Sequence, residues 1–144
     1  MLKNLFEAET LIVEQLETLL PSENIYTDED ISYVKLDVFK TMPPGSRLVV
    51  AIQYDGFEIP ATSGNTANQL IEIRYRVIVV APVGDKMDAG LKFAEILKLL
   101  SGKKLDKFWR ETALIKDVRE FNAAEYGDGM VAIPALFSFK QTLR

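Results

Sequence analysis

The chain has 144 residues, of which 48% are hydrophobic and 26% charged, close to the usage of an ordinary globular domain. It carries 17 Lys and Arg against 21 Asp and Glu, and the formal charge of −4 argues against a nucleic-acid binder, which usually has a basic excess. Because Cys and His are both absent, disulfides, thiol nucleophiles, Ser-His-Asp triads and His or Cys metal sites are excluded. Neither glycine-rich nucleotide motif occurs. We therefore expect no enzyme, no metal and no cofactor.

The N-terminal segment is not expected to be a signal peptide, because Glu7, Glu9, Glu14 and Glu17 interrupt its apolar pattern. No run along the chain approaches the roughly 20 apolar residues of a membrane span. We therefore expect a protein that is assembled in the cytoplasm and has no membrane partner.

Residues 2–20 are predicted to form an amphipathic helix, because apolar residues recur at three- and four-residue steps. Pro21 ends this helix. A short strand is expected at 24–27 and a second helix from about 28 to 40. Three carboxylates at its start suit the positive end of a helix better than a Ca²⁺ or Mg²⁺ site, because the spacing of a calcium loop is missing: Asp28, Glu29 and Asp30.

The middle of the chain contains a predicted strand followed by a long polar segment. Residues 47–54 have the composition of a strand, and Asp55-Gly56 indicates a turn. A loop or arm is then expected over 55–69, where Gly, Ser, Thr and Asn dominate. Loops of this length inside a domain are usually functional or disordered. Two interpretations stay open, an arm that reaches a neighbouring subunit and a mobile hairpin tip.

Residues 70–81 are predicted to form the longest strand. Charges alternate with apolar residues in its first half only, so one end should be half-exposed and the other buried on both faces. Arg74 and Arg76 in that first half could join Lys116 and Arg119 in a basic patch. A solvated sheet face held by salt bridges is the better interpretation.

A helix is predicted over 86–101, and Gly102 stands where its C-terminal cap belongs. A charged connection containing the only Trp follows, and a further strand is expected at 112–121. The apolar stripe of the helix is expected to consist of Met87, Leu91, Ala94, Leu97 and either Leu100 or Ser101.

The last strand is predicted over 130–143. Pro134 inside it suggests an edge strand or a bulge. We expect it to present Phe137 and Phe139 near an open sheet edge, of the kind that natural proteins usually cover.

Together these elements predict an α+β fold. The whole chain, 1–144, is expected to be a single domain with a mainly antiparallel sheet of about four to five strands. The two main helices, 2–20 and 86–101, should pack on one face of the sheet.

A pattern of turns and strands between residues 46 and 143 carries a resemblance to a known family. Its parts are Val49–Tyr54 with Asp55-Gly56-Phe57, the strand Ile73–Ala81, Ala89-Gly90 opening a helix that ends Leu97-x-x-Leu100-x-Gly102, and Tyr126-x-x-Gly129 before Ile133-Pro134-Ala135-Leu136-Phe137-Ser138-Phe139. In this order the chain resembles the tail terminator proteins of Mu-like contractile-tailed phages and related phage tail-like particles.

The resemblance implies a structural virion protein at the head-proximal end of the tail. Such proteins form a hexameric ring that caps the tail tube and ends the polymerisation of tube and sheath. The ring also provides the docking surface for the neck or head connector. The implied partners are further copies of the chain and the tube, sheath and neck proteins. DNA would pass through the lumen without sequence-specific binding.

A ring made of head-to-tail contacts needs two different, complementary faces on each subunit. One face is expected around the loop 55–69 and the neighbouring arginines. The opposing face is expected among the acids of 117–128, and an acidic lumen would repel the phosphates of DNA. The candidate interface residues are Asp55, Gly56, Phe57, Thr62, Asn65, Arg74, Arg76, Asp117, Glu120, Glu125 and Asp128.

Functions of other classes stay open beside this one. The chain could be a different head–tail neck (connector) protein, which also forms a ring. It could be a small ligand-binding α+β domain with a pocket between sheet and helices, which a metabolite would stabilise. A histidine-free enzyme would instead need carboxylates with perturbed pKa values in a cleft.

Overall fold

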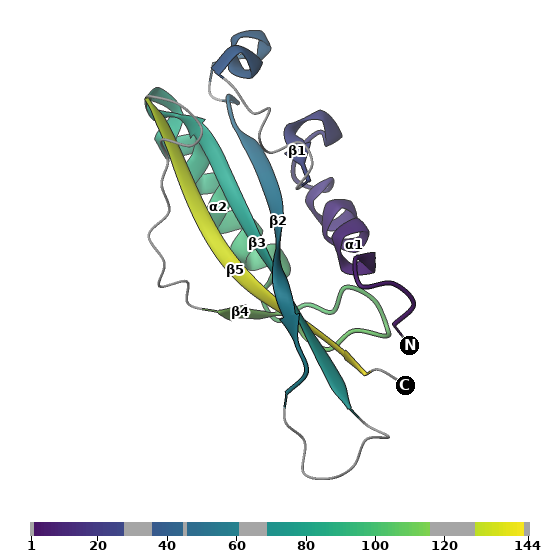
Figure 1. The fold of residues 1–144 in the computed structure, drawn as a ribbon. Helices are drawn as coiled ribbons and strands as arrows, with labels where there is room; N and C mark the ends of the chain where they lie inside the picture. The colour runs from purple at the N-terminus through teal and green to yellow at the C-terminus, as the bar shows by residue number, and fades with distance from the viewer. Residues whose placement is uncertain (1, 28–35, 45, 61–68, 116–128, 143–144) are drawn as a thin grey trace.

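A five-stranded sheet in the order β1-β2-β3-β5-β4 organises the chain (Figure 1). The computed structural model describes residues 2–27, 36–44, 46–60, 69–115 and 129–142. β1 runs parallel to β2, and every other neighbouring pair is antiparallel, which confirms the mainly antiparallel α+β prediction. The strands are β1 Ile25–Tyr26, β2 Val49–Glu58, β3 Leu70–Pro82, β4 Ala113–Ile115 and β5 Met130–Thr142.

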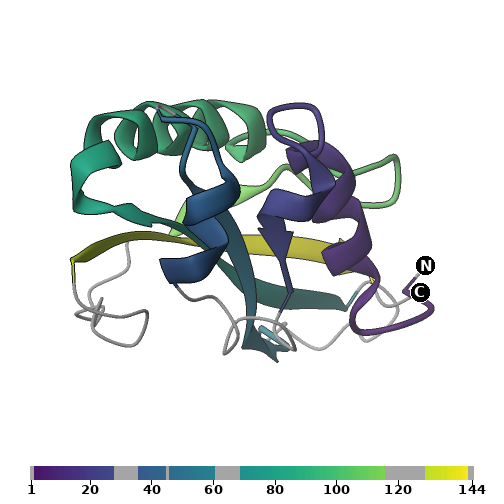
Figure 2. The ribbon, with the colours of Figure 1, turned by 90° about the horizontal axis from the view of Figure 1, so that it is seen from above.

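Both α-helices, α1 (Glu7–Leu16) and α2 (Lys86–Leu100), cover the same face of the sheet, as the view along the layers in Figure 2 makes plain. Their buried side chains join the inward side chains of β2, β3 and β5 in one continuous core. From the helices, the fully buried contributions are Ala8, Ile12 and Leu16 of α1 and Ala89, Ile96 and Leu100 of α2.

A second, smaller core lies on the opposite face of the sheet, at one end only. There Phe39, in the 3-10 helix η3 (Leu36–Thr41), packs with Val49 and Ala51 of β2 and with Ile78 and Val80 of β3. The second half of β3 is therefore buried on both faces, as the residue pattern of 70–81 predicts. The first half is less exposed than predicted, because Glu72 and Arg76 are buried and only Leu70 and Arg74 are half-buried.

The N-terminal helices are shorter than predicted. α1 begins after Phe6, and beyond Leu16 the chain continues in single turns to Leu20 rather than in a regular helix. In the second predicted helix, the described part is the 3-10 helix η3. The three carboxylates at the predicted start of that helix lie outside the described residues.

The prediction of a turn at Asp55-Gly56 is wrong, because β2 continues through it to Glu58. Tyr54 pairs with Tyr75 and Phe57 pairs with Ile73, so two residues of β2 face one residue of β3 in a β-bulge. Gly56 adopts φ +95°, which an L side chain rarely adopts, and so lets the chain absorb the extra residue. The polar connection to β3 is correspondingly shorter than 55–69.

The apolar stripe predicted for α2 is right at Leu100, which is buried, and at Leu97, which packs against the main core, but wrong at its other three residues. Met87 and Leu91 are among the most exposed hydrophobic side chains, and the core side of α2 carries Ala89, Ile96 and Leu100. Apolar residues occupy more than one face of this helix at the same spacing, so periodicity alone cannot select the buried face. The cap prediction is confirmed, since Gly102 takes φ +75° directly after the helix.

The last strand is an inner strand, because β5 lies between β3 and β4. Phe137 and Phe139 are buried in the main core, which corrects the expectation that they sit at an open edge. Pro134 pairs with Ile78 of β3. On the β4 side, the last described pair is Ile115 with Leu136, so Pro134 lies outside the described β4–β5 pairing. Residues 116–128 of the predicted strand and turn lie outside the described part of the chain.

Candidate interaction surface

The β-bulge determines which side chains of β2 share a face beyond Tyr54. Because Phe57 is level with Ile73, it lies on the helix-covered face, together with Tyr54 and Tyr75. The side chains of Asp55 and Glu58 lie on the opposite face, where they form ion pairs with the arginines of β3. A glycine in the bulge thus separates an apolar from a charged surface at the end of the β2–β3 hairpin.

Two arginines of β3 and three carboxylates form ion pairs on the charged face. Arg76 Nη1 lies 3.5 Å from Asp55 Oδ1, with only 10% and 19% of the two side chains exposed. Arg74 Nε donates to Glu72 Oε1 at 2.7 Å, and its Nη2 lies 3.2 Å from Glu58 Oε2. The hydrogen bond to Glu72 holds the pKa of Arg74 above its ordinary value. The prediction of a salt-bridged sheet face is confirmed for both arginines.

The helix-covered face of the same hairpin is aromatic. The ring of Tyr54 makes edge-on contacts with Phe6, at 5.1 Å between centroids, and with Tyr75, at 5.7 Å. Tyr75 in turn contacts Phe139 and donates its hydroxyl to Glu9 Oε2 at 3.3 Å. Burial raises the pKa of the Tyr54 hydroxyl. These contacts tie the base of the hairpin rigidly to α1 and β5.

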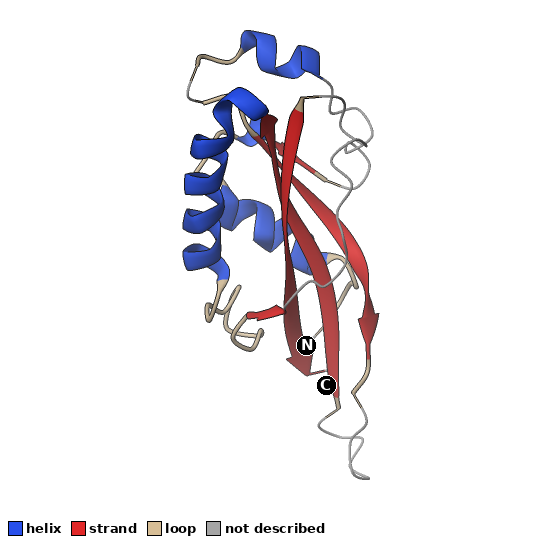
Figure 3. Cartoon of the chain, turned by 90° about the vertical axis from the view of Figure 1, so that its left-hand side faces the viewer, coloured by secondary structure: helices blue, strands red, loops and turns tan. Residues whose placement is uncertain are grey.

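Beyond this aromatic base, β2 and β3 continue past the helices (Figure 3). Phe57 is 53% exposed there, and Ile59 after the end of β2 is exposed as well. The end of the hairpin thus carries two exposed hydrophobic side chains, and the ion pairs lie on its other face.

The sheet ends in two different edges. At one edge, β1 pairs with β2 only at Val50 and Ala51. Within the described part of the chain, residues 53–58 of β2 therefore pair with β3 on one side and with no strand on the other side. β2 is fully buried up to Ile52 and only half-buried or exposed from there on. On the other side, β4 is the last described strand, and its Leu114 is 48% exposed.

The connection between α2 and β4, residues 102–112, is a basic loop that the sequence analysis did not single out. Leu105 and Trp109 anchor it by burial, and Trp109 forms an isolated β-bridge with Gln141. Among the described residues no ion pair forms with its exposed cations, Lys103, Lys104, Lys107 and Arg110. The sequence shows only a charged connection with one Trp, because the burial of Leu105 and Trp109 becomes visible only in the structure.

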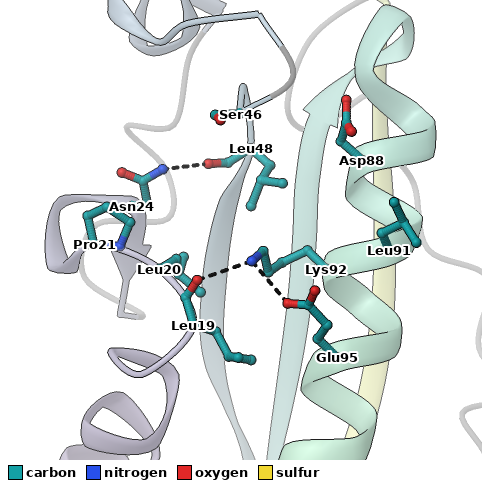
Figure 4. Close-up of a pocket in the computed structure, with 10 residues that line it drawn as sticks. All are labelled: Leu19, Leu20, Pro21, Asn24, Ser46, Leu48, Asp88, Leu91, Lys92 and Glu95. Carbon is teal, nitrogen blue, oxygen red and sulfur yellow. Dashed lines mark hydrogen bonds and ion pairs between the residues drawn. The ribbon is translucent and has the colours of Figure 1, made fainter.

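A small hollow of about 290 Å³ lies between the end of α1 and α2 (Figure 4). Lys92 reaches into it from α2 and donates to the carbonyl of Leu19 and to Glu95, both at 3.1 Å. Asn24 Nδ2 donates to the carbonyl of Leu48 at 2.9 Å. Lys92 and Asn24 thus already have partners within the protein, and the volume is at the lower end of the range for small-molecule sites.

Five of the predicted interface residues can be placed. Asp55, Gly56, Phe57, Arg74 and Arg76 come together at the bulge and on the strand beside it, although the arginines are engaged in ion pairs. The others lie outside the described residues, and their roles stay predictions: Thr62, Asn65, Asp117, Glu120, Glu125 and Asp128.

In the part of the chain that the structure describes, no three Asp or Glu side chains gather in a way that could hold a metal ion. No helix there is long and apolar enough to cross a membrane. Comparison with protein-family models and with curated proteins found no match to this chain.

Proposed function

We propose that this chain is a structural virion protein of the tail terminator class, which assembles into a ring on the tail tube. The observation that carries the proposal is the difference between the two edges of the sheet, at β2 and at β4. One edge carries the exposed Phe57 and the carboxylate of Glu58 near the end of β2. The other has Leu114 and the basic loop. Two unlike faces on one subunit are what a ring of head-to-tail contacts requires.

The resemblance over residues 46–143 supports the more specific part of the proposal. It suggests six copies, which would end the polymerisation of tube and sheath and would offer a surface to the neck or head connector. DNA would pass through the lumen without base-specific contacts.

Native mass spectrometry over a concentration series, combined with negative-stain microscopy, tests the proposal. We expect a species of six times the 16.2 kDa chain that images as a ring with a central hole. Purified tail tubes of the same particle provide the second arm, in which the protein should bind only at tube ends and stop their growth. A protein that stays monomeric alone and does not bind tube ends contradicts the proposal.

The same samples of protein and tail tubes also distinguish two other functions from this one. A different neck protein would form a ring that binds connector proteins but leaves tube growth unchanged. A small ligand-binding domain would use the hollow beside Lys92, and a metabolite that binds there would raise the melting temperature. Substitution Leu91→Trp at the mouth of the hollow would abolish that shift without affecting tube capping.

A further inference from the structure

We propose that the basic loop and the neighbouring part of α1 form a docking site for an acidic peptide segment of a partner protein. The site consists of two hollows that share Phe108. The first hollow takes carboxylates of the segment, and the second takes an apolar side chain that stands next to them. This inference goes beyond the proposed function, because it rests on the chemistry of the two hollows and requires neither a ring nor a tail tube.

The first hollow has a volume of about 600 Å³ and is basic. Three cations line it, namely Lys104, Lys107 and Arg110. The carboxylate of Glu111 in the same lining offsets only one of them. Among the described residues no ion pair forms with any of the three cations, and the Nζ of Lys107 lies 5.1 Å from the centre of the Phe108 ring. A hollow lined mainly by charges of one sign concentrates ligands of the opposite sign, so this one attracts carboxylates.

The second hollow, of about 500 Å³, lies between the basic loop and the first residues of α1, which are neighbours in Figures 1 and 2. Most of its wall is apolar, and the large apolar side chains in that wall are Leu11 of α1 and Phe108. Phe108 is 55% exposed and lines both hollows. An apolar side chain of a partner that packs against Leu11 and Phe108 would therefore be buried directly beside the basic hollow.

The basic loop is held in place before any partner binds. Two backbone hydrogen bonds join its ends: the N–H of Gly102 donates to the carbonyl of Thr112 at 2.7 Å, and the N–H of Thr112 donates to the carbonyl of Lys103 at 2.9 Å. Between these ends, Leu105 and Trp109 are buried in the main core. Binding of a partner therefore requires little ordering of the loop backbone, which lowers the entropic cost of association.

The distribution of charge favours a peptide over DNA as the ligand. DNA presents closely spaced phosphates along its whole surface. In the second hollow, however, the carboxylates of Glu7 and Asp106 outnumber the one cation, Lys3, and they would repel a further phosphate. A peptide that carries carboxylates at one position and an apolar side chain at the next fits both hollows. The formal charge of −4 for the whole chain also disfavours nucleic acid.

Fluorescence anisotropy with a set of labelled peptides and the full chain tests the site. Each peptide contains a run of Asp and Glu, a glycine-serine spacer of varied length, and one Leu or Phe. We expect at least one spacing to bind, and to bind on the order of tenfold more weakly when its acids are replaced by Asn and Gln or its apolar residue by Ser. No binding by any peptide at concentrations up to about 1 mM overturns the proposal.

Charge reversal locates the binding within the basic hollow. Lys104→Glu/Lys107→Glu should weaken binding of the acidic peptides on the order of tenfold or more. The matched control is Lys86→Glu/Lys98→Glu, which changes the net charge equally at exposed positions of α2 outside both hollows and should leave binding unchanged. All four side chains are exposed, so circular dichroism should show that both variants remain folded. Equal losses in the two variants would indicate attraction to net charge alone and would overturn the proposal.

Phe108→Ala tests the apolar hollow separately. This variant should lose affinity for the peptides that carry Leu or Phe, and it should bind the peptides with Ser in that position as the unchanged chain does. The exposed position of Phe108 makes the substitution compatible with the fold. An equal loss for both kinds of peptide would mean that no apolar side chain enters the second hollow, and the proposal would be overturned.

Two further measurements identify the other occupants of this surface. A labelled DNA duplex that binds where the peptides do not, and that is released by Lys104→Glu/Lys107→Glu, would assign the surface to nucleic acid and overturn the proposal. If no peptide binds and the same variant changes the oligomeric state of the chain, the surface joins copies of the chain, and the proposal is overturned as well. Peptide binding by a protein that does not cap tail tubes would support the docking site and reject the terminator function.

Discussion

Measured along the strands, the two ends of the sheet differ in how they are covered. One end is packed on both faces, and the other carries charged side chains on one of its faces. At the closed end, residues 49–52 of β2 and 77–81 of β3 are packed between the α-helices on one face and η3 on the other. At the open end, helices and aromatic rings cover one face of 53–58 of β2 and 70–76 of β3. The other face carries ion pairs.

Burial explains why the closed end should dominate the free energy of unfolding. Each fully buried aliphatic side chain contributes a few kcal/mol, whereas exposed ion pairs contribute about 0–1 kcal/mol each. The ion pairs of the open end therefore add little to stability, whereas its helix-covered face, with Ile73 and Tyr75 fully buried, belongs to the main core. A long strand such as β3 joins the two ends, so the stable part positions the interacting part.

Removing a side chain from the closed end should have the largest effect. Ile78→Ala leaves a cavity beneath η3 in a fully buried position, and we expect the free energy of unfolding to fall by about 2–4 kcal/mol. Urea denaturation measures this loss. Leu114→Ala, at an exposed position of the open end, is the matched control and should cost less than about 0.5 kcal/mol. Equal losses in the two variants would contradict the comparison.

The most buried ion pair should have the next largest effect, because little of either side chain is exposed to water. Arg76→Met leaves the carboxylate of Asp55 without this cation at a site that is largely shielded from water. We expect a loss of about 1–3 kcal/mol, less than for a fully buried pair. Thermal unfolding of Arg76→Met and of Asp55→Asn should give losses of the same sign. A stabilised variant would refute this interpretation of the pair.

The bulge should be sensitive to backbone conformation alone. A Cβ at Gly56 would meet no neighbouring atom, but its φ of +95° is strained for alanine, so Gly56→Ala should cost about 1–2 kcal/mol. Gly90 in α2 has the same open surroundings and a helical backbone. Gly90→Ala should therefore raise stability by about 0.5–1 kcal/mol, because alanine favours the helix. Melting temperatures that shift in the same direction for both variants would exclude a conformational cause.

The smallest effect on stability is expected at the outermost ion pair. Glu58→Gln removes the exposed partner of Arg74, which keeps its hydrogen bond to Glu72. We expect a change within about 0.5 kcal/mol in chemical denaturation. A loss as large as that of Arg76→Met would mean that the open end is a part of the stable core.

Several features of the fold could be predicted because short-range patterns encode them. Alternation of apolar and charged residues located β3 and its two-sided burial, and Gly102 marked the end of α2. The ion pairs of Arg74 and Arg76 followed from their position on a half-exposed strand. The buried face of α2 could not be predicted, because apolar residues occur around most of this helix and only its packing on the sheet selects one side.

The bulge was misinterpreted for a related reason. Asp-Gly after a strand has the composition of a turn, and a glycine at positive φ serves a turn and a bulge equally well. What decided between them was the pairing of Phe57 with Ile73, a contact with a strand that follows later in the chain. The basic loop escaped notice because its charges look like those of any solvated connection until Trp109 and Leu105 are seen to anchor it.

The sequence by itself determined the class of fold, the number of main helices and the strand with one open end, since these depend on local periodicity. Tertiary structure alone decided that β5 lies inside the sheet, that Phe137 and Phe139 are core residues, and that β2 continues through a bulge at Gly56. The physical reason is that strand order and register are set by contacts between residues far apart in the chain. No local pattern of charge or hydrophobicity records which edges remain unpaired.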